Sequence, residues 1–448
     1  MRWGELAGQF LVRGSARLVM LTDSQIRAIA KAMVSGQSII ANRIDAGYTY
    51  FGQFIAHEVV PPTHPLPGTK RTATTPYLDL DSLYGTVDQM PRFLDQHNRF
   101  PIGPNFPGGP DDLPRQNGMA KVPEPRSDDN VILSQLHLFL QRFHNFVIDK
   151  GFAESPLEAR RLVTLVFQLL TVEDYLRQVL APVVFDSYFR FHKRWLNFDA
   201  TKIPPEFSRA AFRFGHTMAR PFYEGFPGMP DAKLEQLFRP DANLEAALVL
   251  EWPQFFGWPE EDDPTQDAAR LDPFLVVAMG SIPRGAGSAP VDIVLMNLRS
   301  GQEAELPAGG AYVATILDGP NGDAIRAALS LDRVPDLGDF AAAELAAVGV
   351  SIDNLPLWPY VLVEAMHSNK GQHLGVLGSM ICAEVLANSI IYAQHSIYRN
   401  GWPAIDDVFA SMGRLGDLLQ KERRDSARPR FTARTFCVRH VVDMVLRG

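Results

Sequence analysis

Apolar residues recur at the spacing of an amphipathic helix over long stretches of this chain. Between Leu133 and Val147 they follow a three-four spacing, which places them on one face of a helix. The same spacing runs from Leu157 to Leu180 and again from about Gly378 to Gln394. Alternating patterns typical of strands are weak and short. We therefore predict a mainly α fold with very little β structure.

Breaks in this pattern suggest how the chain is organised. Pro and Gly cluster at residues 101–115 and 224–230, and four acidic residues and a proline fill 260–264. Such clusters indicate surface loops, and no internal repeat divides the chain. We predict an N-terminal extension at 1–40, a single large helical domain at 41–400 and a C-terminal helical tail at 401–448.

Composition narrows the possible partners and location. The 448 residues carry a net charge of -8 and no basic run, so we expect neither nucleic acid nor an anionic membrane surface as a partner. No stretch reaches the length of an apolar membrane span, and the first 30 residues lack the apolar core of a signal peptide. Only Cys382 and Cys437 are present, which suits a reduced compartment. We expect a cytoplasmic protein without a membrane span.

The segment 46–58 carries the first candidate chemistry. Gln53 and His57 are four residues apart, so they share one face of a helix, and Glu58 follows directly. A histidine, an amide and a carboxylate together can handle protons. Taken alone, a histidine in this setting is more often a satisfied core or surface residue.

A second segment, 75–85, alternates carboxylates with other oxygen donors. Thr75, Tyr77, Asp79 and Asp81 lie two residues apart in turn. Hard cations such as Ca²⁺ take six to eight oxygens from carboxylates, hydroxyls and backbone carbonyls. A turn with solvated aspartates accounts for this segment equally well.

Three further segments each hold one notable polar residue. Arg126 stands at the mouth of the long helix after residue 130, where an arginine is usually a solvated charge. His216 lies in an apolar run and is equally compatible with a core histidine. Asn297 follows an apolar stretch and, if buried, needs a hydrogen-bond partner.

These five segments, in this order and spacing, resemble the animal-type haem peroxidases of the peroxidase-cyclooxygenase superfamily, in particular their bacterial members. The resemblance covers roughly residues 41–395 and includes the segments 374–379 and 383–385. It implies one large helical domain with the haem between central helices. It also implies haem b and Ca²⁺ as cofactors.

The resemblance assigns catalytic roles to the polar residues on both sides of the haem. His57 matches the distal histidine, Gln53 the glutamine of the distal water network and Arg126 the distal catalytic arginine. His216 matches the proximal iron ligand, and Asn297 the residue that accepts its other ring N–H. The distal pair His57 and Arg126 suits peroxide cleavage, because imidazole moves protons near neutral pH and a guanidinium stabilises charge on the leaving oxygen.

The resemblance also implies binding residues for the haem and the calcium ion. Arg213 matches a position near the haem propionates. The positions that match the family's calcium site are Glu58, Thr75, Tyr77, Asp79 and Asp81, with Tyr77 contributing its backbone carbonyl.

The chain departs from the family at the positions that attach the haem covalently. Ala56 precedes His57 and cannot form an ester, whereas Asp129 is one methylene shorter than the glutamate usual there. Asn130 cannot form a sulfonium link. We therefore expect the haem to be non-covalent, or held by one ester at most, through Asp129.

The function implied is a haem peroxidase that uses H₂O₂ to oxidise small organic or halide donors. Two alternatives stay open: a fatty-acid dioxygenase or cyclooxygenase-like oxygenase of the same superfamily, and a non-catalytic haem-binding protein. The oxygenase requires a tyrosine three residues before the proximal histidine, and Arg213 occupies that position. The sequence leaves the electron donor and the oligomeric state open.

Overall fold

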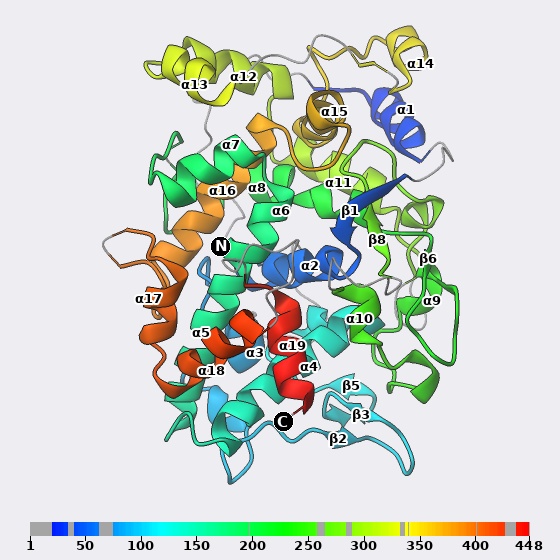
Figure 1. The fold of residues 1–448 in the computed structure, drawn as a ribbon. Coiled ribbons are helices and arrows are strands. Elements are labelled where there is room, and N and C mark those ends of the chain that lie inside the picture. The colour runs from blue at the N-terminus through cyan, green and yellow to red at the C-terminus, as the bar shows by residue number, and fades with distance from the viewer. Residues whose placement is uncertain are drawn as a thin grey trace.

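The computed structural model describes residues 20–34, 40–61, 75–196, 198–257, 265–283, 289–331, 337–338, 340–399, 401–425 and 436–447. Helices dominate, as the sequence predicts. In the view of Figure 1, α2 lies at the centre, α12 and α13 lie at the top, and the short strands β2, β3 and β5 lie at the bottom. Helix α19 crosses the front, close to α4, on which it packs.

The α-helices are α1 Asp23–Met33, α2 Gly47–Val59, α3 Asp81–Tyr84, α4 Val131–Asp149, α5 Pro156–Leu170, α6 Arg177–Val179, α7 Pro182–Phe185, α8 Pro205–Ser208, α9 Leu234–Leu237, α10 Trp252–Phe255, α11 Ile293–Glu303, α12 Gly309–Asp318, α13 Gly322–Leu329, α14 Ala342–Ala347, α15 Leu357–Asn369, α16 Val376–Ile391, α17 Ile405–Ala410, α18 Arg414–Asp425 and α19 Val438–Arg447. The 3-10 helices are η2 Met90–Arg92, η3 Pro125–Asp128, η6 Ala211–Met218, η7 Ala246–Leu248 and η8 Val277–Gly280. Two wider π-helical segments are η4 Thr171–Leu176 and η5 Asp186–Arg190.

Strands within the described residues form only two-stranded antiparallel pairs. These are β1 Ala41–Asp45 with β8 Asp267–Ala269, β2 Gly103–Pro104 with β3 Asp111–Asp112, β4 Arg115–Gln116 with β5 Met119–Ala120, and β6 Phe222–Tyr223 with β7 Ala232–Lys233. The expectation of very little β structure is confirmed.

The three long helices read from the apolar spacing are present, with one difference. Helix α4 begins where the Asn130 side chain accepts a hydrogen bond from the Leu133 amide, and α5 begins at a Ser155 cap followed by Pro156. Helix α16 is also present. The helix expected from Leu157 to Leu180 changes to the π-helical η4 at Thr171 and ends as α6. Apolar spacing alone does not distinguish the two helical forms over so short a stretch.

One large cluster of buried apolar residues runs through the molecule. Helices near both ends contribute to it, for example Ile29 of α1 and Val441 of α19. The domain boundaries at 40 and 400 stay predictions. Both cysteines are free and buried, and none of the helices among the described residues is long and apolar enough to cross a membrane.

One of the expected loops, 101–115, lies within the described residues. Residues 104–108 are exposed, but the segment also holds β2, β3 and the buried Asp112, so it is not a surface loop throughout. The acidic segment 260–264 lies outside the described residues.

Helix α2 is fixed in place by close contacts with η4. A Cβ on Gly52 would lie 2.3 Å from the Tyr175 hydroxyl, so only glycine lets η4 approach this closely. One turn earlier, the Tyr48 hydroxyl donates to Asp174 at 2.6 Å. Helix α2 also packs on α4 and η6, which places its last turn beside the site described next.

Candidate active site

His57 lies in the last turn of α2, with its ring mostly shielded from solvent. Its Nδ1 is buried and has no hydrogen-bond partner among the described residues. Burial lowers the pKa of His57 well below its usual value, and the Arg126 and His216 charges lower it further. The ring is therefore neutral at neutral pH and has a free nitrogen for an added group.

His216 lies across from this helix, on η6, which packs against α2, α15 and α16. Burial, with a smaller contribution from the Arg213 charge, lowers the pKa of His216 to about 3. The ring stands edge-on to Trp358, with 6.4 Å between ring centroids and an interplanar angle of 89°. Its Nδ1 lies 2.7 Å from Nδ2 of Asn297 on α11. A neutral histidine whose Nδ1 is held by a side-chain amide can bind a metal through Nε2 when the ring proton lies on Nδ1.

The orientation of Asn297 differs from the expectation. Oδ1 of Asn297 accepts a hydrogen bond from Arg213, which leaves the amide nitrogen facing His216. In this orientation Nδ1 of His216 accepts and Nε2 carries the proton, because a neutral imidazole has one N–H. A half-turn of the amide, with Arg213 released, would make Asn297 the expected acceptor. Arg213 therefore controls which tautomer His216 adopts.

Arg126 lies close to His57 but holds the backbone of α2 rather than the imidazole. Its Nη2 donates to the carbonyl oxygens of His57 at 3.0 Å and Val60 at 2.9 Å. These carbonyls belong to the end of α2, where no intrahelical donor remains for them. No hydrogen bond from Nη1 to a described residue occurs, so this nitrogen is available to a bound group.

Glu124 is the partner of Arg126 and was missed in the sequence. Its fully buried carboxylate accepts from Nε and Nη2 of Arg126, each at 2.9 Å. The Glu124-Pro125 pair before η3 is the local signal, because an acidic cap followed by proline begins a helical turn. Gln53 is likewise held, since its Oε1 accepts from Nδ2 of Asn130 at 3.1 Å. Arg126 and Gln53, both expected on the distal side, are thus each held by a hydrogen-bond partner.

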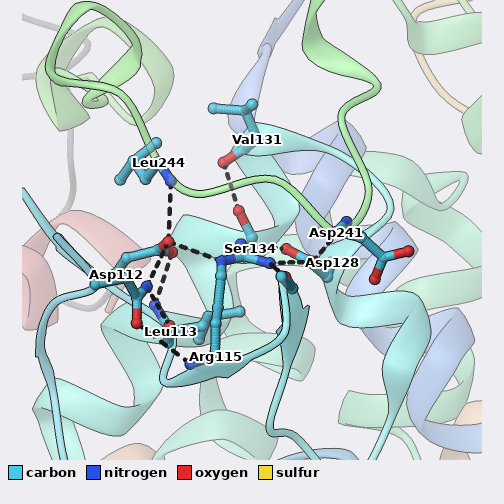
Figure 2. A network of polar contacts seen from close by, with 10 residues as sticks. Asp112, Leu113, Arg115, Asp128, Val131, Ser134, Asp241 and Leu244 are labelled. Carbon is cyan, nitrogen blue, oxygen red and sulfur yellow. Dashed lines mark hydrogen bonds and ion pairs between the residues drawn. The ribbon is translucent and has the colours of Figure 1, made fainter. Parts of the chain in front are cut away.

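A buried ion-pair network anchors η3, the segment that carries Arg126. Figure 2 shows Arg115 between Asp112 and Asp128, with Asp128 also accepting from the Asp241 amide. The Arg115 guanidinium donates to both oxygens of Asp128 at 2.6 and 2.8 Å and to Asp112 at 2.9 Å. Asp128 lies between Arg126 and Asp129, so this network fixes the position of both.

We expect Arg115→Met to lower the free energy of unfolding by about 3–5 kcal/mol, because it leaves two buried carboxylates unpaired. The side chains of Arg115 and Asp112 are 4% exposed and that of Asp128 is 7% exposed. The matched control is Arg142→Met, which breaks the exposed pair with Asp111, and such pairs contribute about 0–1 kcal/mol. Chemical denaturation measures both variants. Equal losses would show that the Arg115 network is not a buried anchor.

The five residues expected to bind calcium lie in one region, but they are already engaged. Both oxygens of Glu58 accept backbone N–H groups, from Asp81 at 2.8 Å and Ser82 at 2.9 Å. Asp81 accepts from the Arg160 guanidinium at 2.8 Å and, more weakly, from the Thr75 amide at 3.3 Å.

The remaining two members are engaged as well. Asp79 accepts from the Gln394 amide at 2.8 Å, and the Tyr77 amide lies 3.4 Å from the Thr75 hydroxyl. Burial, followed by the Asp81 charge, raises the pKa of Glu58 to about 8 and that of Asp79 to about 6. Within the described residues, no three His, Cys, Asp or Glu side chains are grouped to hold a metal ion. These pairings do not fit a calcium site.

The arrangement of the two histidines indicates which class of cofactor the site can hold. Two neutral, partly buried histidines lie on adjoining elements of a helical domain. Nδ1 of His57 has no partner among the described residues, and His216 is supported by the Asn297 amide. This donor set fits a haem held by one histidine, with the second free for chemistry on the opposite face.

Comparisons with known proteins identify the family. Residues 58–249 match the family model of the animal haem peroxidases. Human myeloperoxidase is 29% identical over 119 residues, which is 24% of this chain and 16% of that protein. The chain therefore carries an animal haem peroxidase domain and belongs to the peroxidase-cyclooxygenase superfamily. The aligned stretches span at most 27% of the length of the curated relatives.

Solved structures with the same fold include both chemistries of the superfamily. Peroxidase A from Dictyostelium discoideum has a TM-score of 0.63 and 16% identity, covering 88% of this chain and 87% of that one. Fatty acid alpha-dioxygenase from Oryza sativa has a TM-score of 0.60 and 11% identity, covering 92% and 80%. At these identities the likeness is one of fold.

Proposed function

We propose that this chain is a haem peroxidase that uses hydrogen peroxide to oxidise small organic or halide donors. The observation that carries the proposal is the pair His57 and His216. Desolvation lowers the pKa of both rings, so both are neutral at neutral pH, and the elements that carry them, α2 and η6, pack against each other. Nδ1 of His57 has no hydrogen-bond partner among the described residues, and a shielded polar atom of this kind needs one, which an added group could supply.

His216 and Asn297 would hold the haem on one face, with Arg213 beside them. When bound, the haem supplies the two-electron redox chemistry that cleaves the O–O bond of peroxide. Nε2 of His216 would be the nitrogen that holds the iron, which requires the ring proton to be on Nδ1. Release of Arg213 to a haem propionate would free Asn297 to turn and accept that proton, since guanidinium groups bind carboxylates strongly.

On the opposite face, His57 takes a proton from one peroxide oxygen and returns it to the departing oxygen. Its depressed pKa keeps the ring ready to accept a proton at and below neutral pH. Arg126 stabilises the negative charge on the departing oxygen through its free Nη1. Gln53, held by Asn130, orders water beside His57.

We propose haem b, bound without a covalent link or with one ester through Asp129. Ala56 supports this because its methyl group cannot form the other ester. Calcium is not part of the proposal, because Arg160 and backbone amides engage the residues expected to bind it.

The runner-up is a fatty-acid dioxygenase, which the shared fold allows. Arg213 disfavours this activity, because it occupies the position of the required tyrosine and a guanidinium cannot form the radical that abstracts hydrogen from a fatty acid. Arg213 is held in place by Asn297 and by the carbonyl oxygen of Ser208 at 2.9 Å.

The purified, haem-loaded protein distinguishes the two activities directly. We expect H₂O₂-dependent oxidation of a phenol such as guaiacol, and no O₂ uptake when linoleate is added. The two measurements use a chromogenic assay and an oxygen electrode on the same sample. Rapid oxygen uptake with formation of a fatty-acid hydroperoxide would establish the dioxygenase instead.

A further inference from the structure

Arg160 of α5 lies in the segment that the family resemblance assigns to calcium. Its side chain is 4% exposed, and its guanidinium lies over the Tyr84 ring and donates to three oxygens of residues 79–85. Nη1 donates to the carbonyl oxygen of Gly85 at 2.8 Å. Nη2 donates to the carbonyl oxygen of Asp79 at 3.0 Å and to the carboxylate of Asp81 at 2.8 Å. One carboxylate and two carbonyls are the type of oxygen donor that Ca²⁺ takes.

Glu58 holds the other side of the same segment. Its two oxygens accept the amides of Asp81 and Ser82, which begin α3. Glu58 follows His57 in the last turn of α2 and is fully buried. The segment is therefore fixed by a cation on its carbonyl side and by a carboxylate on its amide side, and the carboxylate is adjacent to His57.

A second cation would compete poorly with Arg160. An ion that bridged the carboxylates of Asp79 and Asp81 would have to compete for Oδ1 of Asp81, which accepts from Nη2, and for Oδ1 of Asp79, which accepts from the Gln394 amide. It would also face a buried guanidinium, and two like charges repel strongly where water does not screen them.

We propose that Arg160 replaces a bound calcium ion as the cation that fixes residues 75–85 to α2. Arg160 is thus a positioning residue for His57, acting through Asp81 and Glu58. The inference concerns the folded chain itself and does not depend on the proposed peroxidase activity.

The first test uses the unmodified protein. After purification without chelator, elemental analysis should find no stoichiometric Ca²⁺, and neither EGTA nor added CaCl₂ should shift the melting temperature. A bound ion would be revealed by linkage, since Ca²⁺ at 100 times its Kd raises the melting temperature of a chain this long by roughly 3 °C. Stoichiometric Ca²⁺, or a lower melting temperature in EGTA, would overturn the proposal without any variant.

The second test removes the internal cation. Arg160→Gln should lower the melting temperature, and CaCl₂ should raise it again by roughly 3 °C at 100 times the new Kd, with about one Ca²⁺ bound per chain. Arg160→Lys keeps the charge and should stay insensitive to calcium. Arg161→Gln, which removes the neighbouring charge on the same helix, is the matched control and should show neither effect.

The haem absorption spectrum adds a readout that general destabilisation does not mimic. With haem bound, Arg160→Gln should shift the Soret band, and CaCl₂ should restore it, because the cation acts on the helix of His57. If Arg160→Gln folds but gains no response to calcium, Arg160 is an ordinary ion pair and the replacement is refuted. If the calcium results hold while no peroxidase activity is found, only the proposed function fails.

Discussion

His216→Ala is expected to purify with little or no haem. Haem that lacks a covalent link depends on its axial ligand, so removal of that ligand should lower the haem content by an order of magnitude or more. The measurement is the ratio of Soret to protein absorbance, checked by a pyridine haemochrome assay. His57→Ala removes an imidazole of similar burial and should keep its haem.

Loss of haem must be separated from loss of fold. Replacement of a buried imidazole by a methyl group leaves a cavity that costs about 2–5 kcal/mol, so both variants should be compared by circular dichroism. Free imidazole fits the cavity in His216→Ala and should restore haem binding there. The assignment of His216 fails if His57→Ala loses haem while His216→Ala keeps it.

Much of the fold follows from apolar spacing, because an apolar residue at every third or fourth position indicates a helix without any knowledge of its packing partners. Helix α4 covers the predicted stretch from Leu133 to Val147, and its cap at Asn130 is a local signal. The change from α5 to η4 was not predictable from this spacing. It coincides with the close approach of Tyr175 to Gly52, a contact between residues far apart in the chain.

The candidate site was predicted from motif order. In the structure α2, which carries His57, packs on η6, which carries His216, and Arg126 contacts the end of α2, while the roles of these residues stay predictions. The contacts that fix them could not be derived in the same way. Arg126 pairs with the end of α2 across 69 residues, and Arg160 pairs with Asp81 across 79 residues. A pairing of this kind depends on which helices pack together, so neither the spacing nor the residue type indicates it. The calcium expectation rested on the oxygen donors of residues 75–81 and on the resemblance, and it did not include Arg160.

The contact of Arg213 with Asn297 was likewise not predictable from the sequence. Its match to a propionate-binding position came from the resemblance, whereas the structure places it on Asn297. Arg213 could bind Asn297 in the absence of haem and a propionate in its presence, because Asn297 has only one carbonyl oxygen. If His216 donates its N–H to that oxygen, the guanidinium needs another acceptor, and a haem propionate is a suitable one.

His57→Ala should lower the rate constant for reaction with peroxide by about 10²- to 10⁴-fold while leaving haem content unchanged. The physical reason is that burial holds the pKa of this imidazole low, so the ring is neutral and can accept the proton. Stopped-flow absorbance after mixing with H₂O₂ measures the rate. His57→Gln, which keeps polarity and approximate size, should be equally slow, because an amide cannot exchange the proton.

Arg126→Gln should lower the same rate constant by about 10²- to 10³-fold, since a charge-stabilising donor is lost. This variant also releases the carbonyls of His57 and Val60, so some loss of stability is expected as well. If the two residues act on one bond-breaking event, the double variant should be slowed by much less than the product of the two single effects. Independent effects that multiply in full would show that Arg126 serves only to hold α2. Unchanged rates in both single variants would refute the mechanism.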